Sequence, residues 1–344
     1  SLLSGYDSSY GPPCMMKRVC YYAIPSPSSW DKTLKNLQPE EIDPFICTHI
    51  IVAFAKIENN IIQPKNSSDL EIYRKVLNLK TINPQLKVML SLNSGFQDLV
   101  KNQDSINLCQ QAETLNGIPQ AVHNLKGLIF GLLSSHPPFI LSIAVAAPVT
   151  IVRSSYEVNK LSENVDFFNL MGYDFRMYKS YFPFTGFNSP LHKGKFDMGY
   201  FATLNIEFAA NYWVSKGAPK NKLVIGIPTY GRTWKLLSFV WHKLHAPAVG
   251  PGMLDGYVSY PEALNFLTQG ASSVFDEHSL VPYSYMGRDW VSFEDKKSIY
   301  EKAIWIKNAS FSGVMTWNLN CDDFTGEASG RKFDLQNVIK EVTE

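Results

Sequence analysis

The sequence lacks an excess of charge of either sign. Its 344 residues include 32 Lys and Arg against 31 Asp and Glu, so the formal net charge is +1. This balance gives no electrostatic case for nucleic acid or for an anionic membrane surface, and we expect neither partner. No apolar run approaches the length needed to span a bilayer. The length is enough for one large domain or two ordinary ones, and the hydrophobic fraction of 45% provides a sizeable core.

Metal and nucleotide motifs are also missing. None of the five cysteines belongs to a CxxC pair, and no histidine stands at metal-ligand spacing from a cysteine. We therefore expect no metal site. No glycine-rich phosphate turn follows the first predicted strand, which counts against a doubly wound open sheet. We expect no cofactor. The chain does not begin with Met and shows no apolar signal segment, which favours a processed or truncated form.

Apolar runs typical of buried strands recur along the chain, and segments with helical spacing lie between most of them. The clearest helical segments are 71–79, 205–214 and 297–306, with a final helix near 335–342. This alternation predicts a parallel sheet in an α/β fold. Seven such strands and one uncertain one suggest a TIM (β/α)8 barrel, with a doubly wound open sheet as the alternative. The strand-like runs are 19–23, 49–54, 87–91, 139–145, 167–173, 223–227 and 313–317.

One Pro- and Gly-bearing region interrupts this alternation and holds a short helical piece and the strand-like 281–285. It predicts a small α+β insertion before the last barrel strand. The first residues carry no clear period and predict a loose, disordered leader. The expected division is a leader at 1–16, barrel units one to seven at 17–232, the insertion at 233–288, and the last strand and helix at 289–344.

In an eightfold barrel, functional side chains stand at the carboxyl ends of the strands. Here those ends give an aromatic-rich set, which suits the apolar faces and hydroxyl edges of a sugar. Each aromatic residue alone is more often part of a core, but the combination at strand ends favours a binding site. The set is Tyr21, Phe54, Met171, Tyr173, Asp174, Tyr230, Arg232 and Trp317.

Several specific blocks from residue 18 to the C-terminus resemble a known family. They are RVCYY at 18–22, FICTHIIVAF at 45–54, LMGYD at 170–174, TGFNSPL at 185–191, IPTYGR at 227–232, WVSFED at 290–295, VMTW at 314–317 and DDFTG at 322–326. By these blocks the sequence resembles family-18 glycoside hydrolases, in the branch of animal chitinases and chitinase-like lectins.

The resemblance implies a sugar-binding role for the strand-end set. Met171, Tyr173 and Asp174 would line a central subsite, with Tyr230 and Arg232 beside it, and Trp317 would form its floor. Cys20 and Cys47 match the first disulfide of the family. Members cleave polymers of β-1,4-linked N-acetylglucosamine, using the N-acetyl oxygen of the substrate as nucleophile. A glutamate on the fourth strand, at the end of a D-x-x-D-x-D-x-E motif, protonates the leaving oxygen.

That motif is missing, because residues 114–156 contain neither Asp nor Glu. In one alignment 123–133 is the fourth strand. The motif positions are then Lys126, Ile129, Gly131 and Leu133, and only 134–138 remains for a crossover that needs roughly a dozen residues. In the other alignment 121–133 is a helix and the fourth strand is lost. Either way we expect no catalytic residue and an incomplete barrel wall around the fourth unit, with exposed apolar surface and reduced stability.

Other departures would shorten the sugar groove. The tryptophan that the family has after strand one falls at Pro25, with Trp30 a poor substitute, and the one after strand six falls near Tyr178 or Lys179. The Gly-Gly-Trp after strand three reads 93–95, Asn-Ser-Gly. The second disulfide of the family is missing, which leaves Cys14, Cys109 and Cys321 without assigned partners.

The sequence therefore predicts a secreted, monomeric chitinase-like pseudoenzyme that binds chitin or N-acetylglucosamine oligosaccharides weakly. Glycosylation sequons at Asn66 and Asn308 are compatible with secretion. One alternative is an active chitinase that uses a displaced acid such as Asp174. The other is a variant or decaying gene product that binds no sugar.

Overall fold

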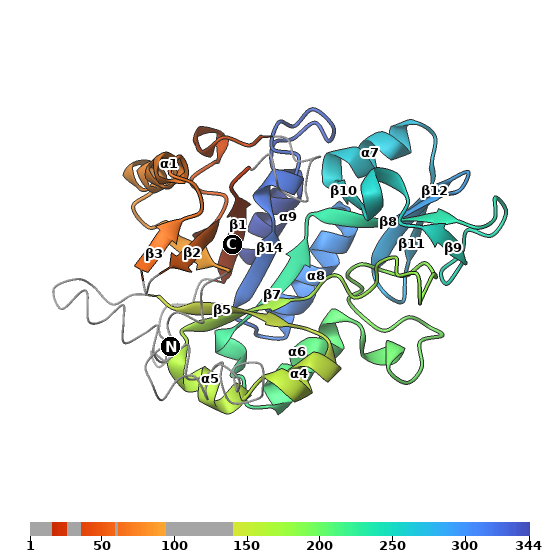
Figure 1. The fold of residues 1–344 in the computed structure, drawn as a ribbon, viewed down its shortest axis with the longest axis horizontal. Helices are drawn as coiled ribbons and strands as arrows, with labels where there is room; N and C mark the ends of the chain where they lie inside the picture. The colour runs from red at the N-terminus through yellow and green to blue at the C-terminus, as the bar shows by residue number, and fades with distance from the viewer. Residues whose placement is uncertain (1–15, 26–35, 59–60, 94–139) are drawn as a thin grey trace, which may run out of the picture.

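The computed structural model describes residues 16–25, 36–58, 61–93 and 140–344, and these ranges form two sheets with helices around them. The larger sheet has eight strands and the smaller has six. In Figure 1 the curled larger sheet occupies the centre, and the smaller sheet lies to its right around β8, β11 and β12.

The larger sheet is a curled, TIM-like parallel sheet, as the alternation of strands and helices predicted. Its strand order is β3-β2-β1-β14-β7-β6-β5. Strand β4 also pairs with β2, along residues 49–55, whereas β3 pairs with residues 55–58. All seven predicted strand runs are present, and only β3 runs antiparallel, as an edge hairpin with β2. The strands are β1 (Lys17–Ala23), β2 (His49–Glu58), β3 (Ile61–Pro64), β4 (Lys87–Leu92), β5 (Ser142–Ala146), β6 (Phe167–Met171), β7 (Leu223–Pro228) and β14 (Gly313–Trp317).

Alternating side chains of each central strand enter two different cores. In β1, Val19 and Tyr21 point into the curl of the sheet, where they pack with Met315. Cys20 and Tyr22 point outward into the cluster that packs on α1. Both faces of the strand are therefore covered, which explains why it reads as a nearly continuous apolar run.

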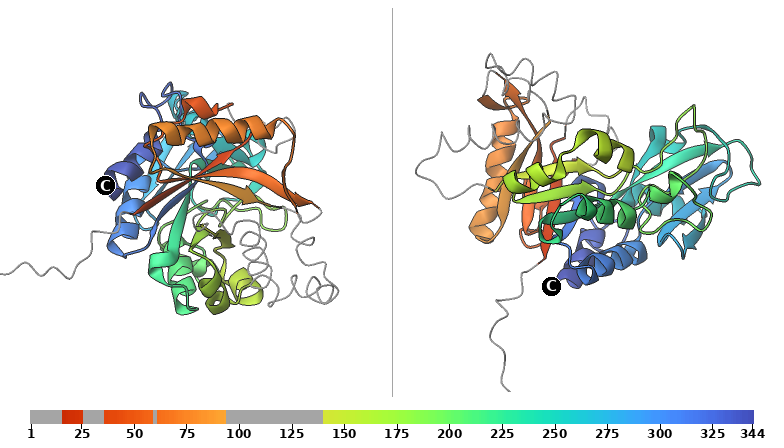
Figure 2. Two further views of the ribbon diagram at one scale, coloured as in Figure 1. Left: turned by 90° about the vertical axis from the view of Figure 1, so that its left-hand side faces the viewer. Right: turned by 90° about the horizontal axis from the view of Figure 1, so that it is seen from below.

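Helices cover the outside of the curl. Figure 2 shows α1 on one side of it and α4, α5 and α6 on the opposite side. The predicted helices at 71–79, 205–214, 297–306 and 335–342 are confirmed as α1, α6, α8 and α9. The α-helices of this layer are α1 (Asp69–Ile82), α4 (Val149–Ser155), α5 (Val158–Asn164), α6 (Ile206–Ser215), α8 (Lys296–Asn308) and α9 (Asp334–Thr343).

The two ends of the curled sheet do not meet within the described ranges. There, β4 pairs only with β2, and β5 pairs only with β6. Residues 94–139 separate these strands in the sequence and lie outside the description. The two alternatives for 121–133 therefore lie outside the described residues, as do Trp30, Cys14, Cys109 and the leader up to residue 15.

The smaller sheet is antiparallel and lies in the chain between β7 and β14, which confirms a separate insertion before the last barrel strand. Its order is β10-β8-β13-β12-β11, with β9 on β8. It extends beyond both predicted limits of the insertion, and the division of the chain into domains stays a prediction. Its elements are β8 (Tyr230–Leu236), β9 (Ala248–Gly250), β10 (Tyr257–Ser259), α7 (Tyr260–Thr268), β11 (Ser272–Asp276), β12 (Val281–Met286) and β13 (Asp289–Ser292).

One assignment from the sequence was wrong. Tyr230 and Arg232 do not end a barrel strand but begin β8 of the antiparallel sheet, where they pair with Ser259 and Tyr257. The change of sheet occurs at Thr229, whose N–H donates to the carbonyl of Trp317 and whose hydroxyl donates to that of Asn318. These bonds fasten the chain to the end of β14 before it leaves the barrel.

The structure contains the disulfide between Cys20 and Cys47, which the family resemblance implied. Both residues are buried, and the bridge ties β1 to the segment that leads into β2. Over the described ranges, no helix combines the length and apolar character needed to cross a bilayer.

Candidate functional site

The eight predicted site residues separate into two layers at the carboxyl end of the curled sheet. Tyr21, Tyr173 and Tyr230 are buried and belong to the core inside the curl. The partly exposed residues are Phe54, Met171, Asp174, Arg232 and Trp317. A ligand can therefore contact the partly exposed residues, whereas the three buried tyrosines support those residues from inside the core.

Trp317, the last residue of β14, is the centre of the aromatic part of the site. Its ring lies 5.6 Å from that of Phe54 at an interplanar angle of 26°, and 5.2 Å from that of Tyr21 at 51°. The peptide bonds Ala53–Phe54 and Trp317–Asn318 are cis. Contacts with these two rings hold the partly exposed indole in place, so it is a preorganised apolar surface for the face of a ring.

Asp174 is the polar centre. It stands just after β6 with a positive φ of 58°, and its N–H donates to Oδ1 of Asn188 at 3.0 Å. Its Oδ1 accepts hydrogen bonds of 2.7 Å from the hydroxyl of Tyr230 and from Nε of Arg232. A carboxylate from the parallel sheet is thus joined to two donors from the antiparallel sheet.

Asn188 and Tyr257 complete this network, and neither was predicted from the sequence. Nδ2 of Asn188 donates to the carbonyl of Tyr230 at 3.2 Å, so one side chain holds the backbone of both sheets. The ring of Tyr257 stacks on that of Tyr230 at 4.6 Å, and Cζ of Arg232 lies 5.4 Å from the Tyr257 ring. The guanidinium is therefore positioned by two aromatic rings as well as by the carboxylate.

Burial and charge shift the ionisation of these groups. Burial raises the pKa of Tyr230 well above its ordinary value, and the negative charge of Asp174 adds to the effect. Burial also raises the pKa of Tyr21 to about 12. For Arg232, burial lowers the pKa, but the hydrogen bond to Asp174 and the nearby phenols outweigh it and raise the pKa overall. The site therefore holds neutral phenols and a charged guanidinium at any physiological pH.

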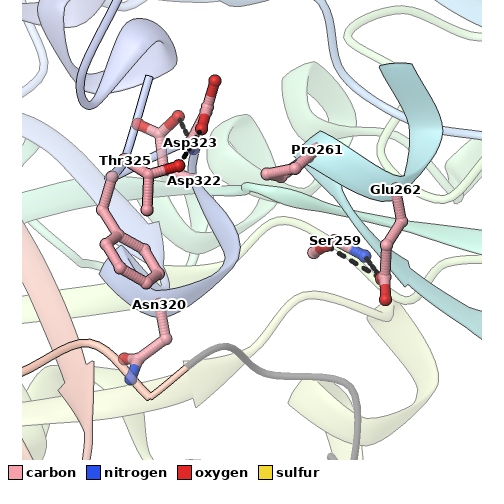
Figure 3. A pocket seen from close by; sticks show the side chains of 8 residues that line it. Ser259, Pro261, Glu262, Asn320, Asp322, Asp323 and Thr325 are labelled. Carbon is pink, nitrogen blue, oxygen red and sulfur yellow. Dashed lines mark hydrogen bonds between the residues drawn. The ribbon is translucent and has the colours of Figure 1, made fainter. Parts of the chain in front are cut away.

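A small cavity of about 50 Å³ lies away from this network, between the start of α7 and the loop after β14 (Figure 3). It is too small for a sugar, since ligand pockets typically reach roughly 300–1,000 Å³. Its acidic residues are already occupied: Asp322 accepts from the N–H groups of Asp323, Leu335 and Gln336. It is lined by Ser259, Pro261, Glu262, Asn320, Asp322, Asp323, Phe324 and Thr325.

The carboxylate of Asp322 therefore acts as a helix cap. Leu335 and Gln336 are in the first turn of α9, where unpaired N–H groups need acceptors. Burial raises the pKa of Asp322 to about 7, while these backbone donors oppose the shift. In the part of the chain that the structure describes, no group of three or more His, Cys, Asp or Glu side chains is placed to hold a metal ion.

Comparison with known proteins gives one consistent result. The model of the family "Glycosyl hydrolases family 18" matches residues 17–115 and 117–322. Human chitinase-3-like protein 2 is 33% identical, over 94% of this chain and 92% of that protein. Mouse chitotriosidase-1 is 32% identical, over 90% of this chain and 74% of that protein.

The same similarity holds in three dimensions. The solved structure of human YKL-39, described as a pseudo-chitinase with retained chitooligosaccharide binding, superposes with a TM-score of 0.85. The two chains are 32% identical, and the match covers 95% of this chain and 99% of the other.

Proposed function

Because the chain belongs to glycosyl hydrolases family 18, we propose that it is a chitinase-like protein that binds N-acetylglucosamine oligosaccharides without hydrolysing them. The observation that carries this proposal is the preorganised set of Trp317, Asp174 and Arg232 at the carboxyl end of the curled sheet. It offers a ring face and hydrogen-bonding groups, and the proposed lack of hydrolysis rests on the sequence of residues 114–156.

Binding is supported by how firmly the contact residues are held. The Trp317 ring contacts those of Phe54 and Tyr21, and Asp174 is fixed by Tyr230 and Arg232. A ligand that meets groups already in position loses less conformational entropy on binding. An apolar ring face next to a carboxylate and a guanidinium matches the apolar face and hydroxyl edges of a pyranose.

The absence of hydrolysis is supported by the sequence of the region where the family has its acid. Residues 114–156 contain no Asp or Glu, so the D-x-x-D-x-D-x-E pattern cannot be written there. A general acid supplies about 10²–10⁴-fold in rate. Asp174 is suited to binding instead, because its Oδ1 already accepts hydrogen bonds from Tyr230 and Arg232.

The affinity we propose is weak, because the outer stacking platforms of the family are replaced. Pro25, Asn93 and Tyr178 or Lys179 stand at or near the positions where the family has tryptophan-bearing loops. Each lost stacking contact removes on the order of 1 kcal/mol. Binding then rests on the central Trp317.

Secretion is part of the same proposal. A buried disulfide in a chain with few cysteines favours folding in an oxidising compartment. Asn66 and Asn308, the two sequon asparagines, are both exposed and so accessible to glycosylation. We propose a secreted glycoprotein that acts as a monomer.

An active chitinase is the second candidate, and the similarity to mouse chitotriosidase-1 favours it. Both candidates need the same central subsite, so binding alone does not separate them. Cleavage of a fluorogenic chitobioside does. We expect no release of fluorophore above the uncatalysed background, and clear turnover would overturn the inactive assignment.

Calorimetric titration with chitotetraose tests binding. We expect weak binding by the wild type and its loss in Trp317→Ala, because that change removes the central ring face. Trp305→Ala is the matched control: Trp305 lies on α8 and contacts Phe311, away from the site. The Trp305→Ala variant should bind chitotetraose as the wild type does. A correctly folded wild type that gives no heat would overturn the proposal in favour of a non-binding variant.

A further inference from the structure

Two loops beside the candidate site contact each other, and we call the surface that they carry the rim. They comprise residues 175–201, after β6, and 235–249, which join β8 to β9, with the turn 286–289 beside them. The N–H of Ala248 donates to the carbonyl of Pro183 at 2.8 Å, and that of Thr185 donates to the carbonyl of Ala246 at 3.0 Å. His245 Nε2 lies 3.7 Å from Asp197 Oδ1. These contacts hold the loops against each other, on the side of the molecule that carries β8 and β9 in Figure 1.

The rim exposes large apolar side chains at several points. Val240 is 87% exposed, Tyr181 84% and Met198 80%, although comparable side chains elsewhere are mostly buried. Four of the five consecutive residues 237–241 are large, apolar and exposed. A cluster of this kind on a soluble chain typically marks an interaction surface. The exposed set is Tyr181, Phe184, Phe196, Met198, Tyr200, Phe201, Leu237, Phe239, Val240, Trp241 and Val249.

The rim also holds a local excess of positive charge. It carries seven basic side chains against two acidic ones, although the whole chain has a formal charge of only +1. One of the acids, Asp289, is paired with Lys235 at 3.0 Å. The basic residues are Arg176, Lys179, Lys193, Lys195, Lys235, Lys243 and Arg288. Of these, Lys179, Lys193, Lys195 and Lys243 are exposed, so the balanced total charge conceals a locally basic surface.

Arginine side chains fix the aromatic part of the rim from within. Cζ of Arg176 lies 4.5 Å from the ring centroid of Phe182 and 4.9 Å from that of Phe201. Nε of Arg288 donates to the carbonyl of Leu236 at 2.6 Å, and its Cζ lies 5.7 Å from the Phe239 ring. These contacts hold the rings of Phe201 and Phe239 in place, which reduces the entropy that these side chains lose on binding.

The rim combines exposed aliphatic side chains with basic residues, and this combination favours one class of partner over the others. A neutral polysaccharide would use the rings but neither Val240 nor the lysines. A sulfated glycan or a nucleic acid would use the lysines but not Val240, Leu237 or Met198. A second copy of the chain would bring two basic faces together, which like charge disfavours. An anionic lipid surface uses both features, since apolar tips enter the interface while lysines meet the headgroups.

We propose that the rim binds the surface of anionic lipid bilayers, with Val240 and Trp241 entering the interfacial region. The expectation of no membrane partner came from the total charge and from the lack of a spanning segment, and neither tests a local surface. This inference is tested independently of sugar binding, because Val240, Trp241 and Lys243, the residues changed in its test, belong neither to the central site nor to its hydrogen-bond network.

Co-sedimentation with vesicles tests the proposal. We expect the full chain to bind vesicles of phosphatidylcholine with 30% phosphatidylserine at low salt, and to bind phosphatidylcholine alone much more weakly. Val240→Ser with Trp241→Ser should lower binding more than tenfold. Lys243→Ser should lower it about fivefold, and raising the salt concentration should weaken what remains.

The matched control is Leu77→Ser with Ile82→Ser. Both residues are exposed and apolar but lie on α1, at the opposite end of the molecule in Figure 1. This variant should bind vesicles as the wild type does, and circular dichroism checks that each variant is folded. No binding to anionic vesicles, an equal loss in the control, or retention on heparin without vesicle binding would each overturn the proposal.

Discussion

The carboxylate of Asp174, at the end of parallel strand β6, lies 2.7 Å from Nε of Arg232 in antiparallel strand β8. The ion pair therefore joins the two sheets at the point where the candidate site lies. Its side chains are 33% and 17% exposed, so the charges are largely shielded from water. Loss of either partner should affect both the stability of the chain and the sugar affinity.

Asp174→Asn tests this pair. The substitution leaves the Arg232 guanidinium without its anion in a mostly buried position, which we expect to cost about 1–3 kcal/mol in the free energy of unfolding. Affinity for chitotetraose should fall as well. Asp289→Asn is the control, because the Asp289–Lys235 pair is more exposed and should contribute less than about 1 kcal/mol. Urea unfolding of both variants measures the difference, and equal losses would contradict the prediction.

The disulfide gives a second prediction. Cys20 and Cys47 are separated by 27 residues, and closing a loop of that length stabilises the folded state by about 3–4 kcal/mol in the chain-entropy model. The double variant Cys20→Ser, Cys47→Ser should lose about that much free energy of unfolding. Adding reductant should destabilise the wild type and leave the variant unchanged. A reductant effect of equal size in the variant would show that another thiol is responsible.

His49 predicts a pH dependence. It is buried at the start of β2, and burial lowers its pKa to about 4, with Lys17 and Lys87 contributing. Below pH 6.5 the unfolded chain takes up a proton that the folded chain does not bind until about pH 4. The contribution of His49 to stability is therefore complete above pH 6.5 and falls as the pH decreases toward 4.

Between pH 7 and pH 5 this loss should be about 2 kcal/mol. Since other groups also titrate in this range, the measurement is a comparison with His49→Gln, which cannot take up the proton. Urea unfolding at both pH values should show the smaller pH dependence in the variant. Equal dependence in the two proteins would mean that His49 is not the group concerned.

Patterns within single segments explain which parts of the fold could be predicted. Strands such as β7 are covered on both faces, so their sequences are continuous apolar runs. Helices such as α8 show apolar residues at helical spacing. The site residues at 171–174 and at Trp317 could be predicted because they stand at the carboxyl ends of two such strands, β6 and β14. Whether a tyrosine there is a contact residue or a support does not follow, because burial of Tyr21 and Tyr230 depends on side chains brought from distant segments.

Tyr257 and Asn188 were not predicted because their roles depend on contacts between segments that are distant in the sequence. Tyr257 lies in a strand of three residues whose antiparallel register with β8 places it on Tyr230, and no sequence pattern records that register. Asn188 acts through hydrogen bonds to Asp174 and Tyr230, each remote in the chain. The only available signal was its place in the 185–191 block, which carried the family resemblance without indicating a role. Tyr230 and Arg232 were assigned to the wrong sheet because only one residue, Thr229, separates β7 from β8.

The ends of the curled sheet give the last prediction. No residue of β4 is buried and only Val145 of β5 is, whereas every residue of β7 is buried. Within the described ranges each of these two strands is bonded to one neighbour, and such a strand separates from the sheet without disrupting the remaining strands. We therefore expect the amides of 87–92 and 142–146 to exchange with deuterium through local opening, much faster than those of 223–228 and 313–317.

Substitution should give the same ranking. Leu90 in β4 is 41% exposed, so Leu90→Thr removes little buried area and should cost less than about 1 kcal/mol. Ile225 in β7 is fully buried, so Ile225→Thr places a hydroxyl in the core and should cost several times more. Hydrogen exchange followed by mass spectrometry and urea unfolding check the two parts. Equal protection in all four strands, with equal costs for the two substitutions, would show a sheet that is continuous and equally stable around its whole curl.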